Sequence, residues 1–330
     1  MTPIDLEFLK QSRPHFPVLI REILDALNLP QDNSTEQKVY LDCTFGAGGY
    51  SSFILSNPNT KVIAIDRDKT VMPHVEKLQE QYPDRFSFFL NTFSNYHEIL
   101  DELNIKVDGI VMDLGFSSMQ ISNAERGFSF KNDGELSMEM GLNKTSAYEF
   151  INKASQELLA DVIFYYGEEH KAKQIARRIV DRRVKEEIKT TKQLADIVRS
   201  VIGFKKGSRV DPATKTFQAI RIYINDELHQ LQESLKNSYT YLKPQGRLVV
   251  VSFHSLEDRI VKDFLLNEGY IPKKYENKVA SKEFTKNKPN TDNNNLKFKI
   301  LTKKPILPLE DELEINPPSS SAKLRFAEKL

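Results

Sequence analysis

The first 115 residues alternate short apolar runs with stretches of helical periodicity. The apolar runs are rich in β-branched and aromatic residues and are continuous rather than alternating, which is typical of strands covered on both faces. We place these strands at 39–45, 61–66, 86–90 and 109–114, and helices between them at 50–55, 70–81 and 94–103. Buried strands separated by helices predict βαβ units and a parallel sheet.

The strand pattern stops after residue 120 and returns near residue 213. Helical periodicity covers 147–152, 155–165, 169–185 and 191–202, and then 216–236 and 256–266. A strand is expected at 246–253, a polar loop at 273–295, and a closing hairpin at 297–302 and 322–327. The pattern therefore predicts an α/β domain formed by residues 1–119 and 213–330, interrupted by an all-helical insertion at 120–212.

Composition narrows the class of protein. The 330 residues carry 47 Lys and Arg against 46 Asp and Glu, with 39% hydrophobic residues, as in ordinary globular proteins. One cysteine, Cys43, excludes an internal disulfide framework and a cysteine-based zinc site, and the six histidines are scattered, so we expect no metal. Acids near the start and the lack of a run of about 18 apolar residues favour a soluble, cytoplasmic protein without membrane contact.

Positive charge is concentrated in two segments. Residues 171–209 hold 13 Lys and Arg against 4 Asp and Glu, and residues 273–304 hold 10 against 3. Such asymmetry indicates a polyanionic partner. A solvated helix face explains the first segment equally well.

A glycine-rich loop is the most specific local signal. The first strand runs into Gly46, Gly48 and Gly49 and then into a helix, where a ligand can approach the backbone closely. Asp66 ends the next strand, 20 residues after Gly46, where a carboxylate would bind the hydroxyls of a ribose.

Two cofactors suit this loop. A dinucleotide fingerprint needs a third glycine where this chain has Ser51, whereas Asp42, four residues before Gly46, suits S-adenosylmethionine. S-adenosylmethionine is therefore favoured over a nicotinamide cofactor. A purely structural turn remains an alternative.

Polar side chains follow two further strands. Asp113, Ser117 and Ser118 come after the fourth strand, where they would face the reactive end of a cofactor, although Asp113 could simply cap a turn. His254 follows the strand at 246–253 and is a further catalytic candidate, although a lone histidine is usually structural.

Four residues are candidates for RNA contact. Arg126 and Phe128 lie in a glycine-rich loop, where guanidinium contacts and base stacking are possible, but Phe128 could equally pack in a core. Lys215 directly precedes the helix expected at 216–236, and Arg221 lies on its polar side.

Taken together, these segments resemble the bacterial small-subunit ribosomal RNA cytosine-N4 methyltransferases. The likeness covers nearly the whole chain in order, from His15-Phe-Pro-Val-Leu and Asp42-Cys-Thr-Phe-Gly-Ala-Gly-Gly to Ser321-Ala-Lys-Leu-Arg. Between them lie the matching stretches 65–68, 113–118, 125–130, 166–169, 216–221 and 252–259.

The resemblance implies a class I S-adenosylmethionine-dependent methyltransferase fold, Rossmann-like and mostly parallel, with an inserted helical subdomain. It implies methyl transfer to N4 of a cytidine in the decoding region, within a 30S subunit or a late assembly particle. By position, the family's cofactor contacts fall on Gly48, Gly49, Tyr50, Asp66, Phe93, Asp113 and Gln120.

The chain departs from the family pattern at several positions. Tyr50 stands where many relatives have histidine, and Pro318-Ser-Ser320 replaces a basic segment. Glu135, Ser137 and Glu139 also differ from the usual residues around Asp133. A nicotinamide oxidoreductase, a catalytically silent assembly protein and a methyltransferase acting on another substrate remain the alternatives.

Overall fold

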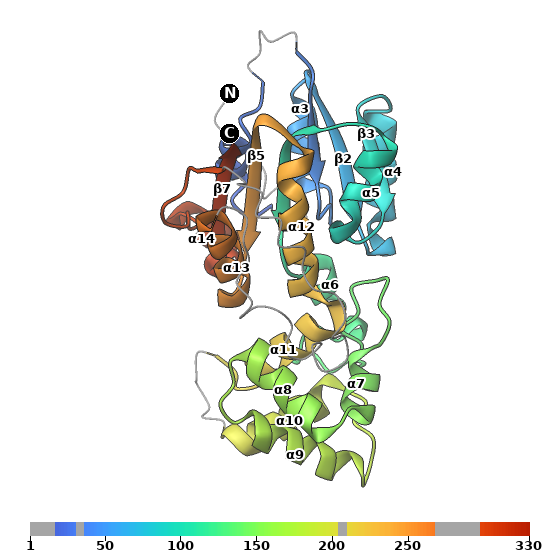
Figure 1. Cartoon of the computed structure of the whole chain (residues 1–330). Helices are drawn as coiled ribbons and strands as arrows, with labels where there is room; N and C mark the ends of the chain where they lie inside the picture. Colours follow the sequence, from blue (N-terminus) through green and yellow to red (C-terminus); the bar gives the residue numbers. More distant parts are fainter. Residues whose placement is uncertain (1–16, 31–35, 204–209, 268–297) are drawn as a thin grey trace. The chain divides into compact units, whose positions relative to one another are not determined.

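A computed structural model describes residues 17–30, 36–203, 210–267 and 298–330. These residues form two compact units, and the boundaries between them fall after Gly115 and after His229. The unit that contains residues 116–229 is helical, and the other unit is built around a sheet (Figure 1). Each is described by itself below.

The sheet unit contains seven strands in the order β3-β2-β1-β4-β5-β7-β6. The first five run parallel, whereas β7 is antiparallel to both β5 and β6. The predicted closing hairpin is thus confirmed for the described residues. The strands are β1 Lys38–Asp42, β2 Thr60–Asp66, β3 Phe86–Leu90, β4 Val107–Asp113, β5 Leu242–Ser252, β6 Phe298–Ile300 and β7 Lys323–Lys329.

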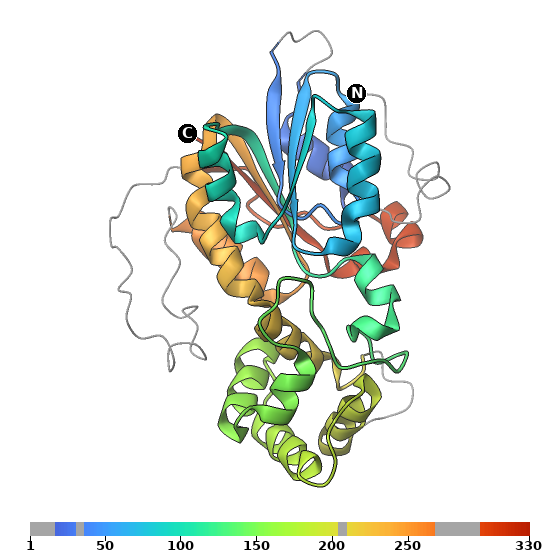
Figure 2. The ribbon, with the colours of Figure 1, turned by 90° about the vertical axis from the view of Figure 1, so that its right-hand side faces the viewer.

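Helices cover both faces of this sheet. Figure 2 shows α3 and α4 on one face and α5 and α12 on the other, as right-handed crossovers require when the strand order reverses between β1 and β4. The helices of this unit are α2 Ile20–Leu27, α3 Gly49–Ser56, α4 Met72–Gln81, α5 Tyr96–Glu102, α12 Glu227–Tyr241 (from Gln230 onward), α13 Ser255–Leu266 and α14 Glu310–Ile315.

The central strands are buried on both faces, which explains their continuous apolarity. Ile110, Val111 and Met112 of β4 are fully buried, as are Val249 and Val251 of β5. This mostly parallel, doubly wound sheet confirms the predicted class I methyltransferase architecture, with a helical unit inserted after β4.

The helical unit has a hydrophobic core of its own. Phe150, Ile163, Ile179 and Val198, from four successive helices, belong to one cluster of buried residues. The helices are α6 Ser118–Ser122, α7 Ala147–Lys153, α8 Gln156–Gly167, α9 Ala172–Arg183, α10 Thr191–Ile202 and α11 Thr214–Asn225.

The single helix expected at 216–236 is two helices, so that expectation was wrong. Asp226 takes a left-handed conformation (φ 51°) and separates α11 from α12. Phe217 and Ile224 of α11 pack into the helical core, so this unit continues beyond the expected boundary at residue 212. Apolar periodicity continues through both helices and conceals the break.

Three smaller points complete the fold. The helices α2 and α14 were not expected from the pattern. The polar loop expected at 273–295 lies outside the described residues. No helix among the described residues is long and apolar enough to cross a membrane.

Candidate functional site

The carboxyl ends of β1, β2 and β4 bring three aspartates to one edge of the sheet. Asp42, Asp66 and Asp113 are the last residues of these strands. The parallel register aligns Asp42 with Ala64 of β2 and Val111 of β4, two residues short of each strand's end. Ligands of open α/β sheets bind at this edge.

The glycine loop joins β1 to α3, as predicted. Gly46 (φ 54°) faces open space, since an added Cβ there would meet no atom closer than 4.0 Å. At Gly48 (φ 75°) and Gly49 the Cβ would lie within 3 Å of Phe45 and Pro17, respectively. Packing therefore already requires glycine at 48 and 49, whereas Gly46 is the position open to a ligand.

Asp66 is held by the loop that it faces. The Gly46 amide donates to Oδ2 at 2.8 Å and the Asp68 amide donates to Oδ1 at 2.9 Å. Burial raises the pKa of Asp66. Because each carboxylate oxygen can accept more than one hydrogen bond, Asp66 still has room to accept from two hydroxyls.

Asp42 is a buried anchor for the start of α3. It is fully buried and accepts from the Ser51 hydroxyl at 2.7 Å and the Thr44 amide at 3.2 Å. Burial raises its pKa to about 6. The neighbouring Cys43 is buried too, and burial raises the pKa of its thiol, so this thiol is unreactive.

Asp113 lies beside the Tyr50 hydroxyl. That hydroxyl is 3.2 Å from Asp113 Oδ2 and 2.6 Å from the Val18 carbonyl oxygen. Asp113 Oδ1 is buried and has no hydrogen-bond partner within the described residues. Burial, with nearby carboxylates, raises the pKa of Asp113 to about 8. An unpaired buried oxygen at a ligand-binding edge is what a hydrogen-bond donor on a ligand would satisfy.

Three acidic groups act on Asp113. Asp42, Glu257 and Glu312 each raise its pKa electrostatically. Glu312 is buried on α14 and accepts from the Leu19 amide at the start of α2. This group of carboxyls provides an environment suited to a cationic ligand. Glu257 and Glu312 were not singled out from the sequence, because only the tertiary fold brings them to Asp113.

His254 has a structural role in the sheet unit. It is the N-cap residue of α13, and its Nδ1 accepts from the Glu257 amide while Glu257 accepts from the His254 amide. The ring Nε2 lies 3.0 Å from Glu257 Oε1. The capping interaction accounts for this histidine, and catalytic contact stays a prediction.

Phe93 is half-buried in a short 3-10 helix, η2 (Phe93–Asn95), which follows β3. Its carbonyl oxygen accepts from the Ser234 hydroxyl at 3.3 Å. Its position after β3, next to the strand that ends in Asp66, is compatible with the predicted contact to an adenine.

The remaining candidates belong to the helical unit. Ser117 is the N-cap of α6 and forms a reciprocal capping box with Gln120, which is buried. Ser118 is the first residue of α6. Ser117 and Gln120 thus have a local structural role. The catalytic roles predicted for Ser117 and Ser118 and the cofactor contact predicted for Gln120 stay predictions.

The four candidates for RNA contact have partners inside the helical unit. Arg126 donates to the Glu139 carbonyl at 2.7 Å and Lys215 donates to the Glu168 carbonyl at 3.1 Å. Arg221 is buried, pairs with both oxygens of Glu227 at 2.9 Å and lies over the Phe116 ring. Phe128 is 9% exposed and belongs to the core cluster, so core packing explains it.

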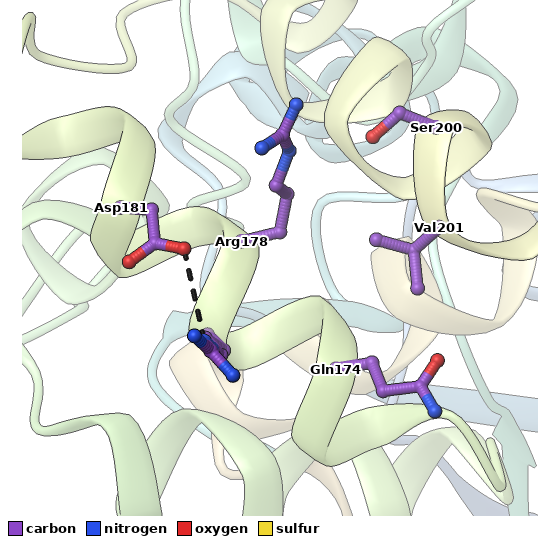
Figure 3. A pocket seen from close by; sticks show the side chains of 6 residues that line it. Gln174, Arg178, Asp181, Ser200 and Val201 are labelled. Carbon is purple, nitrogen blue, oxygen red and sulfur yellow. Dashed lines mark ion pairs between the residues drawn. The ribbon is translucent and has the colours of Figure 1, made fainter.

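More accessible cations lie on α9. Arg177 and Arg178 line an open hollow with Gln174 and Asp181, and Ser200 and Val201 of α10 lie opposite (Figure 3). The Arg177 side chain is 77% exposed, and its distance to Asp181 is 3.9 Å. Part of the basic segment at 171–209 is therefore a solvent-facing surface.

Comparisons of the sequence with known proteins identify the family. The sequence model of the MraW methylase family matches residues 12–330. The chain belongs to this family. It is 48% identical over 319 residues to a protein of Orientia tsutsugamushi (strain Ikeda) named "Ribosomal RNA small subunit methyltransferase H", covering 96% of this chain and 98% of that protein.

A protein of Rickettsia massiliae (strain Mtu5) with the same name is 48% identical over 316 residues, covering 96% of this chain and 98% of the relative. Among solved structures, an rRNA methylase from Streptococcus thermophilus matches with a TM-score of 0.41 and 10% identity, covering 94% of this chain and 96% of that one. Membership of the methylase family therefore rests on the sequence.

Proposed function

We propose that this protein transfers a methyl group from S-adenosylmethionine to the exocyclic N4 of a cytidine in the decoding region of small-subunit ribosomal RNA. The observation that carries the proposal is its 48% identity, over 96% of the chain, to proteins named small-subunit ribosomal RNA methyltransferases. The choice of N4 and of the decoding region rests on the motif resemblance.

The sheet edge has the chemical groups that this cofactor needs. Asp66 can accept from ribose hydroxyls, and Gly46 leaves open space beside it. The carboxyls around Asp113 suit a positively charged group, and Asp113 Oδ1 lacks a partner among the described residues. S-adenosylmethionine would supply an electrophilic methyl group on a cationic sulfur.

The protein's part in the reaction is mainly alignment. A cytosine amine is a poor nucleophile because its lone pair is delocalised into the ring, so it must be oriented toward the methyl carbon. We assign this role to Asp113, whose free Oδ1 can accept a hydrogen bond from N4 and later its proton. Backbone carbonyls near Gly115, with Ser117 or Ser118, are further candidate acceptors.

The helical unit is proposed to bind the RNA. Arg177 and Arg178 lie on an exposed surface of α9 and can contact phosphates without breaking a buried interaction. The substrate we propose is an assembled small subunit or a late assembly particle, and the reaction needs no metal ion.

Transfer of labelled methyl groups to undermethylated small subunits, followed by nucleoside analysis, tests the proposal. N4-methylated cytidine is the expected product. A different methylated nucleoside, or methylated protein, would overturn the choice of target, and cofactor binding without any transfer would favour an assembly protein. Absence of cofactor binding would refute the assignment of the Gly46 edge.

A further inference from the structure

The Tyr50 hydroxyl and the Asp113 carboxyl are in contact, and either group could be the hydrogen-bond donor. Tyr50 has a single hydroxyl proton and two oxygens within reach. The Val18 carbonyl oxygen lies at 2.6 Å and Asp113 Oδ2 at 3.2 Å. The short contact takes the tyrosine proton, since a carbonyl oxygen cannot donate one. The Tyr50–Asp113 contact is then a hydrogen bond only if Asp113 is the donor.

The other neighbours of Asp113 also favour a protonated carboxyl. Asp42 at the end of β1, Glu257 of α13 and Glu312 of α14 each raise its pKa, whereas a hydrogen bond donated by Tyr50 to an ionised Asp113 would lower it. An ionised Asp113 would have Oδ1 buried without a partner and Oδ2 beside a hydroxyl whose proton is already donated. A buried carboxylate with so little compensation is costly.

We infer that Tyr50 is a positioning residue that accepts a hydrogen bond from a neutral Asp113, and that Asp113 releases its proton to solvent when a cationic methyl donor binds. The inference rests on the proposed function, because it assumes that this edge of the sheet binds S-adenosylmethionine.

The proton balance follows from the charges. Before binding, the Asp113 carboxyl is neutral and donates from Oδ2 to the Tyr50 hydroxyl oxygen. When a positive charge arrives, the O–H bond breaks, the proton leaves to water, and the carboxylate neutralises that charge. After methyl transfer, Asp113 accepts the proton that the methylated amine loses, and the carboxyl is again neutral beside an uncharged sulfur. The net proton of methylation is thus released at donor binding.

Calorimetry of the complete protein without RNA can count this proton. Binding heats measured in two buffers of different ionisation enthalpy give the number of protons released per cofactor. S-adenosylhomocysteine is the matched ligand, because it lacks only the methyl group and the positive charge of the sulfur. Near pH 7 we expect S-adenosylmethionine to release about one proton more than S-adenosylhomocysteine, and this excess to vanish above about pH 9.

The affinity for S-adenosylmethionine should depend on pH in the way that this proton release requires. Below pH 8, affinity for S-adenosylmethionine relative to S-adenosylhomocysteine should rise up to about tenfold per pH unit, and it should level off once Asp113 is ionised in the free protein. Asp113→Asn should lose the excess proton and this pH dependence. Glu102→Gln, which removes an exposed carboxyl of α5, is the matched control and should behave as the wild type.

Tyr50→Phe tests the direction of the hydrogen bond. If Tyr50 accepts a hydrogen bond from Asp113, loss of the Tyr50 hydroxyl removes the partner of the neutral carboxyl. The excess proton release near pH 7 should then fall, and the pH at which the relative affinity levels off should also fall. If Tyr50 instead donates to Asp113, that pH should rise, and the inference is wrong. Equal proton release for the two ligands in the wild type would also overturn it. Failure of both ligands to bind would count against the proposed function instead.

Discussion

The buried carboxyl groups at the sheet edge and the exposed carboxyl groups of the helical unit have pKa values shifted in opposite directions. In the sheet unit, burial raises the pKa of Asp42, Asp66 and Asp113 at the ends of their strands. In the helical unit, a hydrogen bond from Lys153 lowers the pKa of Glu149, and one from Arg182 lowers that of Glu186. The strand-end acids therefore differ from acids that already pair with a cation, such as Asp258 with Arg325 in the same sheet unit, and they can stabilise a positively charged ligand.

The two units also differ in the sign of the charge that they offer to a ligand. The helical unit places Arg177 and Arg178 at an open surface, where they suit a phosphate backbone. The acids of the sheet edge suit a small cation. The comparison supports the two binding tasks that we propose, a methyl donor in one unit and RNA in the other. Each of the following experiments tests whether these tasks are separate.

The largest effect is expected at Asp113. Asp113→Ala removes the proposed acceptor for N4 and should reduce methyl transfer about 100-fold. Initial rates with undermethylated small subunits measure the loss, and circular dichroism checks the fold. Glu102→Gln should keep full activity. A wild-type rate for Asp113→Ala would remove this residue from the mechanism.

Replacement of the buried Asn225 side chain is expected to destabilise the helical unit and not the sheet unit. Asn225 donates to the Met138 and Arg221 carbonyls and accepts from the Met140 amide and the Asn143 side chain. Asn225→Leu removes these four hydrogen bonds and should lower the free energy of unfolding by about 2–4 kcal/mol.

Chemical denaturation measures the destabilisation by Asn225→Leu, and hydrogen exchange locates it. The exposed Gln156→Leu is the control, with an expected change below about 0.5 kcal/mol. We expect S-adenosylmethionine binding to survive in Asn225→Leu while RNA binding weakens. Loss of cofactor affinity would show that the two tasks are not separate.

Replacement of Arg177 and Arg178 on α9 is expected to weaken RNA binding and to leave cofactor binding unchanged. Arg177→Ala combined with Arg178→Ala should weaken RNA binding about tenfold and reduce the salt slope of the association constant by about two. Filter binding across a salt series gives both values. Lys77→Ala with Lys262→Ala removes two exposed cations of the sheet unit and serves as the control. Unchanged binding in the arginine variant would leave α9 as an ordinary solvated helix.

The last expected effect is a pH dependence of the free energy of unfolding, which is small at any single pH step. A neutral Asp113 stabilises the fold fully below its ordinary pKa of 3.8, and this contribution is lost as pH rises through about 8. Between pH 5 and 7, the free energy of unfolding of the ligand-free wild type should therefore fall, relative to Asp113→Asn, by up to about 1.4 kcal/mol per pH unit. Denaturant titrations at several pH values measure the difference; parallel curves would mean that Asp113 is ionised in the folded protein.

Much of the fold was predictable from the sequence because local patterns suffice for it. Buried parallel strands must be continuously apolar, so β1 to β5 were located within a few residues, and the glycine loop at Gly46 followed from its sequence alone. The break at Asp226 was missed because a single left-handed residue leaves the apolar periodicity almost unchanged. The short helix α2 was also missed.

The site was predictable only in part. The sequence determined which acids end the strands, because strand ends are local, and it determined the family, because motifs persist in order along the chain. Only the tertiary structure decided that Arg221 pairs with Glu227, that Phe128 packs in a core, and that Glu312 acts on Asp113. Burial, and with it the protonation of a carboxyl, depends on residues far apart in the chain.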